Sequence, residues 1–546
     1  MLQPSPNPDY PTGFKFGITL FALFISLFCV ALDSTIIATA IPRITDQFHA
    51  LQDVGWYGSS YLLTKCAFQL PFGKTFRFFS LKWTFLAALL IFGVGSLLCA
   101  AAPSSPVLIV GRTIAGIGCA GISSGGLIII ANITHLEKRA LWQSLYGGIF
   151  GIASVVGPLL GGVFTDKVSW RWCFYINLPL GAVSAAFIIF SLHLPAKPNP
   201  LKEQGVRTLL WNIDPIGFIL FVPSIILLLF ALQYRGTTYA WNSGRIVALF
   251  VIFGVTLTAF IGSQAWLEEG GTVVANTQQF HLASQSNVRS SARAFLPSCS
   301  LVLSSSSATS FLFIFKQSRE IRLCSLAFTP IPLILPNVIG ILFAGFGSSK
   351  IGYYVPFIYI AVVLAPIGAG LLYTLQPDTS VANLVGYQIL LGFGSGCGFQ
   401  LPQVAAQVVL PPRDILAGIS VSMLFQGLGG AVLISAANNV LNNQLLHLVN
   451  GLGIPGVSGM DVINAGATGF RNVIPAESIS QVVDVYNTAL QRAILIAVIT
   501  SSLSALPAAL LEWRSVKKGR AGSAQPKPEA SSPSLTGSGI EKGSPE

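Results

Sequence analysis

Three features of the sequence predict an all-α polytopic membrane protein. Of the 546 residues, 52% are hydrophobic and only 9% are charged, whereas soluble proteins average about 25% charged residues. The mean hydropathy is +0.69. Apolar runs of about 20 residues, the length that crosses a bilayer as a helix, recur along the whole chain.

The apolar runs predict about fourteen spans. Thirteen of them start near Phe16, Val54, Leu81, Val107, Leu141, Cys173, Ile213, Ile246, Leu326, Tyr353, Val381, Gly418 and Arg492, and a less regular one covers Ala294 to Phe315. Grouped as six, two and six, they predict a six-span half at 1–194 with a short N-terminus and a linker with two extra spans at 195–270. A second half at 271–512 and a disordered tail at 513–546 follow, the tail being rich in Ser, Pro, Gly and Lys.

Basic residues in the short loops predict the orientation of the chain. Alternate loops are richer in Lys and Arg, which marks the cytoplasmic side; these residues are Lys74, Arg77, Lys82, Lys138, Arg139, Lys197, Lys202, Arg207, Lys350, Arg413, Arg514, Lys517, Lys518 and Arg520. Both termini are therefore expected in the cytoplasm, and the polar insertion within 445–490 is expected outside. The cell membrane is the predicted location, with the vacuolar membrane as the alternative.

Several classes of function are excluded by what the sequence lacks. The net charge of +11 is spread over loops and forms no basic patch, so nucleic acid is not an expected partner. The eight cysteines stand singly with no CxxC spacing, which predicts neither a metal site nor a disulfide framework. There is no GxxxxGK[ST] loop for ATP and no HExxH. We expect a monomer without cofactors that is not an enzyme, and whose partners are the lipid bilayer and small molecules.

One stretch interrupts the pattern. From about Gly271 to Pro330 the chain is rich in serine and has Lys316, Arg319 and Arg322 where a ninth span belongs. One hypothesis is an intron-boundary or frame error in the gene model, which sequencing of the transcript would test. The alternative is a diverged, inactive protein.

The glycine-rich stretch from Gly147 to Asp166 is the most informative segment. It carries no charge before its last residue, and glycine costs roughly 1 kcal/mol relative to alanine in a soluble helix. Small residues let a second helix approach closely, and Pro158 frees a carbonyl and favours a bend. The segment is predicted to be a membrane helix at a moving contact between the two halves, and the alternative is static packing.

Two segments resemble the major facilitator exporters. Residues 153–162, ASVVGPLLGG, resemble the antiporter motif of the fifth helix, with Ala153 where glycine is usual, followed by Gly157, Pro158, Gly161 and Gly162. Residues 32–44, LDSTIIATAIPRI, resemble the motif that opens the fourteen-span drug:proton antiporters. The resemblance implies a major facilitator fold and a proton-coupled efflux transporter for small hydrophobic organic compounds. Uptake of a solute such as a siderophore, or an inactive homologue, is the alternative.

Asp33 and Arg112 are the candidate coupling residues. A carboxylate at the bilayer centre costs roughly 2.5 to 3.5 kcal/mol, so Asp33 is interpreted as a proton site or, alternatively, as a helix-end carboxylate because Pro42 follows closely. Arg112 lies in 108–118, which resembles a family motif whose arginine is associated with proton transfer. Arginine keeps its proton, so its role would be electrostatic. The alternative is an arginine that reaches the outer interface.

Two further polar residues are candidates for a substrate cavity. Lys65 lies midway along the second span and could pair with Asp33 or face the cavity. Gln426 lies on an apolar helix, where it could bond a substrate or another helix. The segment 73–82 occupies the position of the facilitator loop motif but lacks that motif's Asp and second Gly, so a gate that uses this Asp is not expected.

Overall fold

The computed structural model describes residues 13–50, 53–192, 214–234, 243–269, 331–376, 379–410, 414–463 and 474–517. The irregular stretch at 271–330 and the tail beyond 517 lie outside these ranges. Within them the chain is almost entirely helical, and the one β-bridge joins Tyr353 to Ser515. The predicted all-α class is confirmed.

The first part of the chain forms a bundle of long helices together with one helix of a single turn, α6. They are α1 (Phe14–Phe48), α2 (Val54–Phe78), α3 (Leu81–Ala100), α4 (Ser105–Ile133), α5 (Leu136–Lys167), α6 (Trp172–Tyr175) and α7 (Asn177–Ser191). Two further helices, α9 (Pro215–Tyr234) and α10 (Gly244–Glu269), pair with each other.

The second part of the chain forms a second bundle, in which α16 is the longest helix. Its elements are α12 (Ile331–Ile351), α13 (Val355–Tyr373), α14 (Val381–Phe399), α15 (Leu401–Val409), α16 (Ile415–Gly451), the 3₁₀ turn η4 (Ala476–Ser478), α18 (Ile479–Leu503) and α19 (Ala505–Ala509). Helices α16 and α18 extend into both ends of the polar insertion expected within 445–490.

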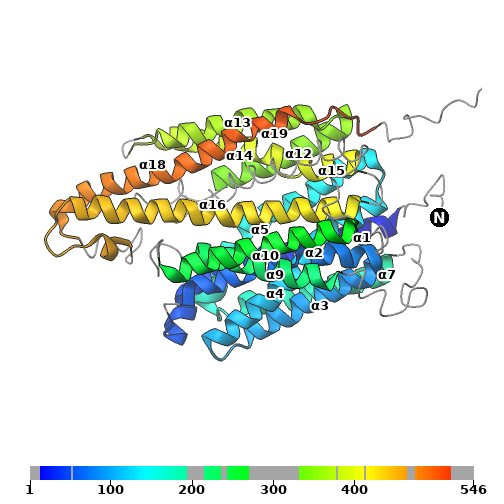
Figure 1. The fold of residues 1–546 in the computed structure, drawn as a ribbon, viewed down its shortest axis with the longest axis horizontal. Helices are drawn as coiled ribbons and strands as arrows, with labels where there is room; N and C mark the ends of the chain where they lie inside the picture. The colour runs from blue at the N-terminus through cyan, green and yellow to red at the C-terminus, as the bar shows by residue number, and fades with distance from the viewer. Residues whose placement is uncertain are drawn as a thin grey trace, which may run out of the picture.

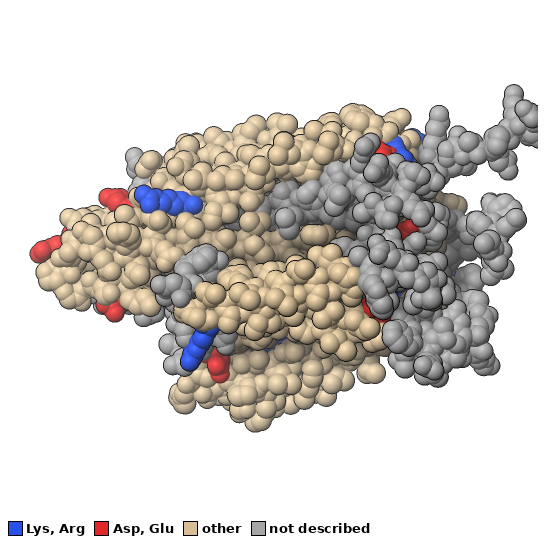
Figure 2. All heavy atoms as spheres, in the orientation of Figure 1, with Lys and Arg blue, Asp and Glu red and all other residues tan. Residues whose placement is uncertain are grey.

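Among the described residues, eleven helical segments are long and apolar enough to cross a membrane. Helices α2 and α14 occupy two more of the predicted spans and carry more polar residues, such as Lys65 in α2 and Gln388 in α14. On the face drawn in Figure 2, charged side chains lie toward the two ends and leave a broad uncharged band between them. This distribution fits a protein whose middle faces hydrocarbon.

The two bundles lie side by side along the long axis of the molecule (Figure 1). We call the end where α1 begins the terminal end, and the opposite one the distal end. The segment after α19 also lies at the terminal end, where Val516 is buried and donates a backbone hydrogen bond of 2.8 Å to Gly352 between α12 and α13. The prediction of a disordered tail is therefore wrong for residues 513–517, which pack against the second bundle.

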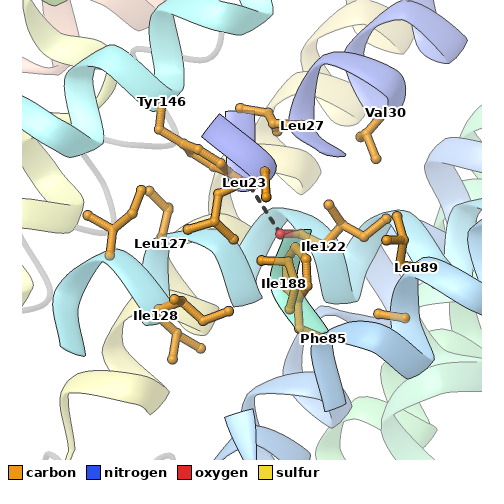
Figure 3. Packing of buried hydrophobic residues seen from close by; sticks show 14 of the residues in the cluster. Leu23, Leu27, Val30, Phe85, Leu89, Ile122, Leu127, Ile128, Tyr146 and Ile188 are labelled. Carbon is orange, nitrogen blue, oxygen red and sulfur yellow. Dashed lines mark hydrogen bonds between the residues drawn. The ribbon is translucent and has the colours of Figure 1, made fainter. Parts of the chain in front are cut away.

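A closely packed apolar core holds the first bundle together. Leu23, Leu127 and Ile188, from α1, α4 and α7, belong to one buried cluster (Figure 3). Tyr146 of α5 enters the same cluster and donates a hydrogen bond of 3.1 Å to the carbonyl of Ile122. The buried hydroxyl of Tyr146 therefore has a partner, as burial requires.

The pair α9–α10 packs against both bundles. Phe221 and Phe260 share a buried cluster with Leu70 of α2 and Leu424 of α16. At the terminal end, the ammonium of Lys74 lies 2.8 Å from the carboxylate of Asp214, which also accepts a hydrogen bond from the backbone of Gly217. Lys74, in the segment that lacks the facilitator Asp, is thus ion-paired to the start of α9.

Glycines set the distance between α3 and α4. A Cβ added to Gly118 of α4 would meet the backbone nitrogen of Phe92 and, at 2.7 Å, its Cα. By contrast, a Cβ at Gly254 of α10 would meet nothing within 4 Å. Gly118 therefore has no room for a side chain, whereas Gly254 has room for one.

We expect Gly118→Ala to destabilise the protein and Gly254→Ala to leave it unchanged or slightly stabilised. The first change pushes α3 away from α4 at a cost of typically about 1 to 3 kcal/mol, whereas the second only removes glycine's penalty in a helix. Thermal unfolding of the purified variants in detergent measures both. Equal melting temperatures would show that the α3–α4 contact yields easily.

Candidate functional site

Asp33 lies inside α1 and is completely buried. The helix continues through Pro42 to Phe48, so the chain does not turn at Pro42 and Asp33 is not a helix-end carboxylate. Its side chain has no solvent exposure. A carboxylate in such a place requires partners, because burying an isolated charge is very costly.

Arg112 of α4 supplies the main partner. Its Nη1 lies 2.5 Å from Asp33 Oδ2, and Arg112 itself is 1% exposed. Its Nε donates to the carbonyl of Tyr57 at 2.8 Å. The interpretation that Arg112 reaches the outer interface is therefore wrong: the guanidinium is turned into the bundle.

Aromatic rings and one amide complete the surroundings. The guanidinium carbon of Arg112 lies 4.2 Å from the centre of the Tyr61 ring and 5.9 Å from that of Phe174, within range of cation–π attraction. Asn177 Nδ2 donates to Asp33 Oδ1 at 3.3 Å. Asn177 was not among the residues predicted from the sequence, although an amide at the start of an apolar helix was a usable signal.

The site is electrically neutral only while both Asp33 and Arg112 are charged, because the two charges cancel. Five helices, α1, α2, α4, α6 and α7, bring five side chains and the Tyr57 carbonyl together from positions up to 144 residues apart. Removing one partner of a buried ion pair typically costs about 3 to 5 kcal/mol, because the other charge remains buried alone. A proton added to Asp33 would have the same electrostatic effect on Arg112 without any mutation.

Small residues of the segment 153–162 lie against α1. A Cβ at Gly157 would meet Thr35 Oγ1 and, at 3.0 Å, Thr35 Cβ, and one at Gly161 would meet Thr39 Oγ1. Ala153 is buried on the same face, and its carbonyl accepts a hydrogen bond of 3.2 Å from Thr35. The prediction that Gly157 faces the other half is therefore wrong.

The rest of the motif faces outward or continues the helix. A Cβ at Gly162 would meet nothing within 4 Å, and Leu159 is 66% exposed. Pro158 lies inside α5, which runs unbroken to Lys167.

The contact between the halves uses earlier glycines of α5. A Cβ at Gly147 would lie 2.8 Å from Gln400 Cγ, and one at Gly151 would meet Val338 of α12. Ser144 of α5 similarly lies against Gly345 of α12. These contacts belong to the first half of α5, toward the terminal end.

Lys65 and Gln426 do not join the ion pair. Lys65 is half-buried on α2, and the described part of the chain contains no ion pair that includes it. The hypothesis that it pairs with Asp33 is therefore wrong. Gln426 is half-buried on α16, and its Oε1 accepts a hydrogen bond of 3.4 Å from Gln403 of α15.

Among the described residues, no group of three or more His, Cys, Asp or Glu side chains is placed to hold a metal ion. Six cysteines in these ranges are buried and free: Cys29, Cys66, Cys99, Cys119, Cys173 and Cys397. The site is therefore built from one ion pair, one amide and aromatic faces.

Two helical bundles that meet along one seam, with a buried ion pair inside the first, define a membrane carrier. The chain matches the Major Facilitator Superfamily over residues 23–434 and belongs to that family. It is a multi-pass membrane protein.

Comparison with known proteins adds detail. The chain is 45% identical over 515 residues to "Efflux pump aflT" of Aspergillus parasiticus, covering 93% of this chain and 98% of that protein. It is 45% identical over 516 residues to "MFS-type efflux pump MFS1" of Trichophyton rubrum, covering 93% of each. "Efflux pump roqT" of Penicillium rubens is 44% identical over 506 residues, covering 91% of each.

Solved structures share the fold. The human organic anion transporter MFSD10 aligns with a TM-score of 0.57 at 13% identity, covering 92% of this chain and all of that one. A double-Trp mutant of XylE aligns with a TM-score of 0.57 at 12% identity, covering 92% of this chain and 97% of its own.

We expect Gly157→Ala to lower the melting temperature and Gly162→Ala not to, because only the first methyl would meet α1. Changing Thr35→Ala in the Gly157→Ala variant should restore part of the loss, since it removes the hydroxyl that the new methyl meets. Melting curves of the three variants in detergent test this. If Thr35→Ala gave no recovery, the α1–α5 contact at Gly157 would not be the source of the loss.

Proposed function

We propose that this protein exports small, mostly hydrophobic organic molecules and that protons moving inward drive the export. Relatives that match nearly the whole chain carry the name efflux pump. The observation that carries the coupling part of the proposal is the buried ion pair of Asp33 and Arg112.

The ion pair is suited to respond to one proton. While Asp33 is ionised, the pair is neutral and its buried state is tolerated. When Asp33 takes a proton, Arg112 keeps its charge and loses its compensation, and the hydrogen bonds from Arg112 and Asn177 to the carboxylate weaken. Any movement that lets water or another acceptor reach Arg112 then lowers the free energy of the bundle.

The membrane supplies the energy for this exchange. One elementary charge that crosses the membrane potential gains about 2.3 kcal/mol per 100 mV. A carrier that opens to each side in turn uses this gain only if the proton and the substrate exclude each other. We propose Asp33 and Arg112 as the coupling residues, with Lys65 and Gln426 near the substrate path.

The proposed organisation follows the sequence. The halves are 1–194 and 271–512, with 195–270 between them and a cytoplasmic tail at 513–546. We propose a monomer in the cell membrane with both termini in the cytoplasm, so that the terminal end faces inward. The basic residues of alternate loops support this orientation.

We expect Asp33→Asn to abolish proton-driven export, because the amide neither takes up nor releases a proton. Arg112→Lys keeps the charge but loses the planar fork that reaches both Asp33 and the Tyr57 carbonyl, so its export should also fall. The measurement is efflux of a hydrophobic fluorescent dye from proteoliposomes with an imposed pH gradient.

A double variant with a neutral pair at these two positions separates loss of coupling from loss of folding. Asp33→Asn alone leaves Arg112 uncompensated and is destabilising by typically about 3 to 5 kcal/mol. The double variant Asp33→Asn with Arg112→Gln has no buried charge and should melt closer to wild type while remaining uncoupled. Dye export that still follows the pH gradient in this double variant would remove Asp33 from the coupling mechanism.

A further inference from the structure

Buried glutamine side chains gather where the two halves meet. Gln143 comes from α5 of the first half, and Gln400, Gln403 and Gln407 follow the end of α14 and the length of α15 in the second half. Gln143 and Gln403 have no exposure, Gln407 has 3% and Gln400 has 5%. Amides so fully buried are unusual in an otherwise apolar contact.

Two hydrogen bonds of this cluster cross from one half to the other. Gln407 Nε2 donates to Gln143 Oε1 at 2.9 Å, and Gln400 Nε2 donates to the backbone carbonyl of Gln143 at 3.0 Å. Gln143 therefore receives both bonds and is the attachment point in the first half. Its neighbour Ser144 lies against Gly345 at the same contact.

The cluster is also incompletely bonded. Gln143 Nε2, Gln407 Oε1 and Gln426 Nε2 are buried and find no hydrogen-bond partner among the residues that the structure describes. The amide of Gln403 fits in two orientations, one donating to Gln426 at 3.4 Å and the other to the carbonyl of Gln400 at 2.8 Å. Each unpaired atom disfavours the packed state, because water would satisfy it if the halves separated.

We propose that the pair Gln143–Gln407 is a reversible latch that holds the halves together at the terminal end while leaving that end ready to open. The two inter-half hydrogen bonds stabilise the closed state, and the unpaired amide atoms weaken it. An apolar contact of the same size would gain more from staying closed. The inference rests on the proposed function, since a latch has a use only where the halves separate at this end.

The latch predicts a non-additive response to mutation. Gln407→Leu leaves the whole amide of Gln143 buried without a side-chain partner. Gln143→Leu removes one of the two acceptors of Gln407 Nε2 and leaves it only the backbone carbonyl of Gln403, at 3.1 Å. Each single change should therefore open the terminal end. The double change replaces both amides by apolar side chains of similar size, which is close to neutral or stabilising, and it should close the end again.

Water access to the contact provides the measurement. In the full chain in proteoliposomes, Ser144→Cys is the reporter, and a charged maleimide labels it only when water reaches the seam. Mass spectrometry of the peptide that contains residue 144 separates this label from the natural cysteines. We expect labelling about five- to thirtyfold faster in each single variant and at or below the starting rate in the double variant.

The matched control is Gln388→Leu. Gln388 is also a buried glutamine with an unpaired carbonyl oxygen, but it lies on α14, which packs against α12 and α13 of its own half. Gln388→Leu should leave the labelling rate of residue 144 unchanged. If this variant raised the rate as much as the latch variants do, the effect would be a general loosening of the second half, and the latch would be overturned.

Two other outcomes also overturn the proposal: unchanged labelling in both single variants, or a double variant whose rate is the product of the two single effects. Labelling needs no substrate, so it separates the latch from the proposed function. If the variants show the labelling pattern while the protein with its natural glutamines exports no dye, export is contradicted and the latch stays in place. Export without the pattern would do the reverse.

Discussion

The exclusion of water from the hydrocarbon layer is the constraint on which this structure depends. A polar group in the middle of the bundle cannot rely on solvent, so it destabilises the packed state unless another helix or its own backbone supplies a partner. The serine and threonine hydroxyls of α1 largely do the latter; Ser26, for example, donates to the carbonyl of Ala22 four residues earlier. Asp33 cannot, and its need for a cation holds α1 against α4.

This dependence explains why the ion pair is surrounded so completely. A guanidinium has several donors, and those at Nη1 and Nε are used by Asp33 and the Tyr57 carbonyl while two aromatic faces cover the group. The arrangement stabilises one charge state very well and the other poorly. A site of this kind is sensitive to a single proton because it has no solvent to absorb the change.

Much of the helical architecture was predictable because hydrophobic runs of spanning length have few alternatives to a helix. Asp33 and Arg112 were each recognised as exceptional, since a charge inside an apolar run is costly wherever it lies. Their pairing was not, because it joins positions 79 residues apart and depends on how the helices rotate. For the same reason, the glycine at position 157 showed that something approaches closely without showing that Thr35 of α1 is what approaches. The spacing of Gln400, Gln403 and Gln407 puts them on one helical face, but nothing in the sequence shows that Gln143 of the first half meets them.

The attachment of α9 and α10 has a mechanical consequence. On α2 the pair is held by a directional bond, Lys74 to Asp214, and by ring contacts such as Phe68 with Phe218, at 5.7 Å between centres. Against α16 it packs apolar side chains, with Phe221 and Leu424 in one buried cluster. An ion pair keeps its length, whereas apolar surfaces can slide past each other with little change in energy. If the halves move relative to each other, the hairpin of α9 and α10 should therefore move with the first half, while its apolar surface shifts along α16.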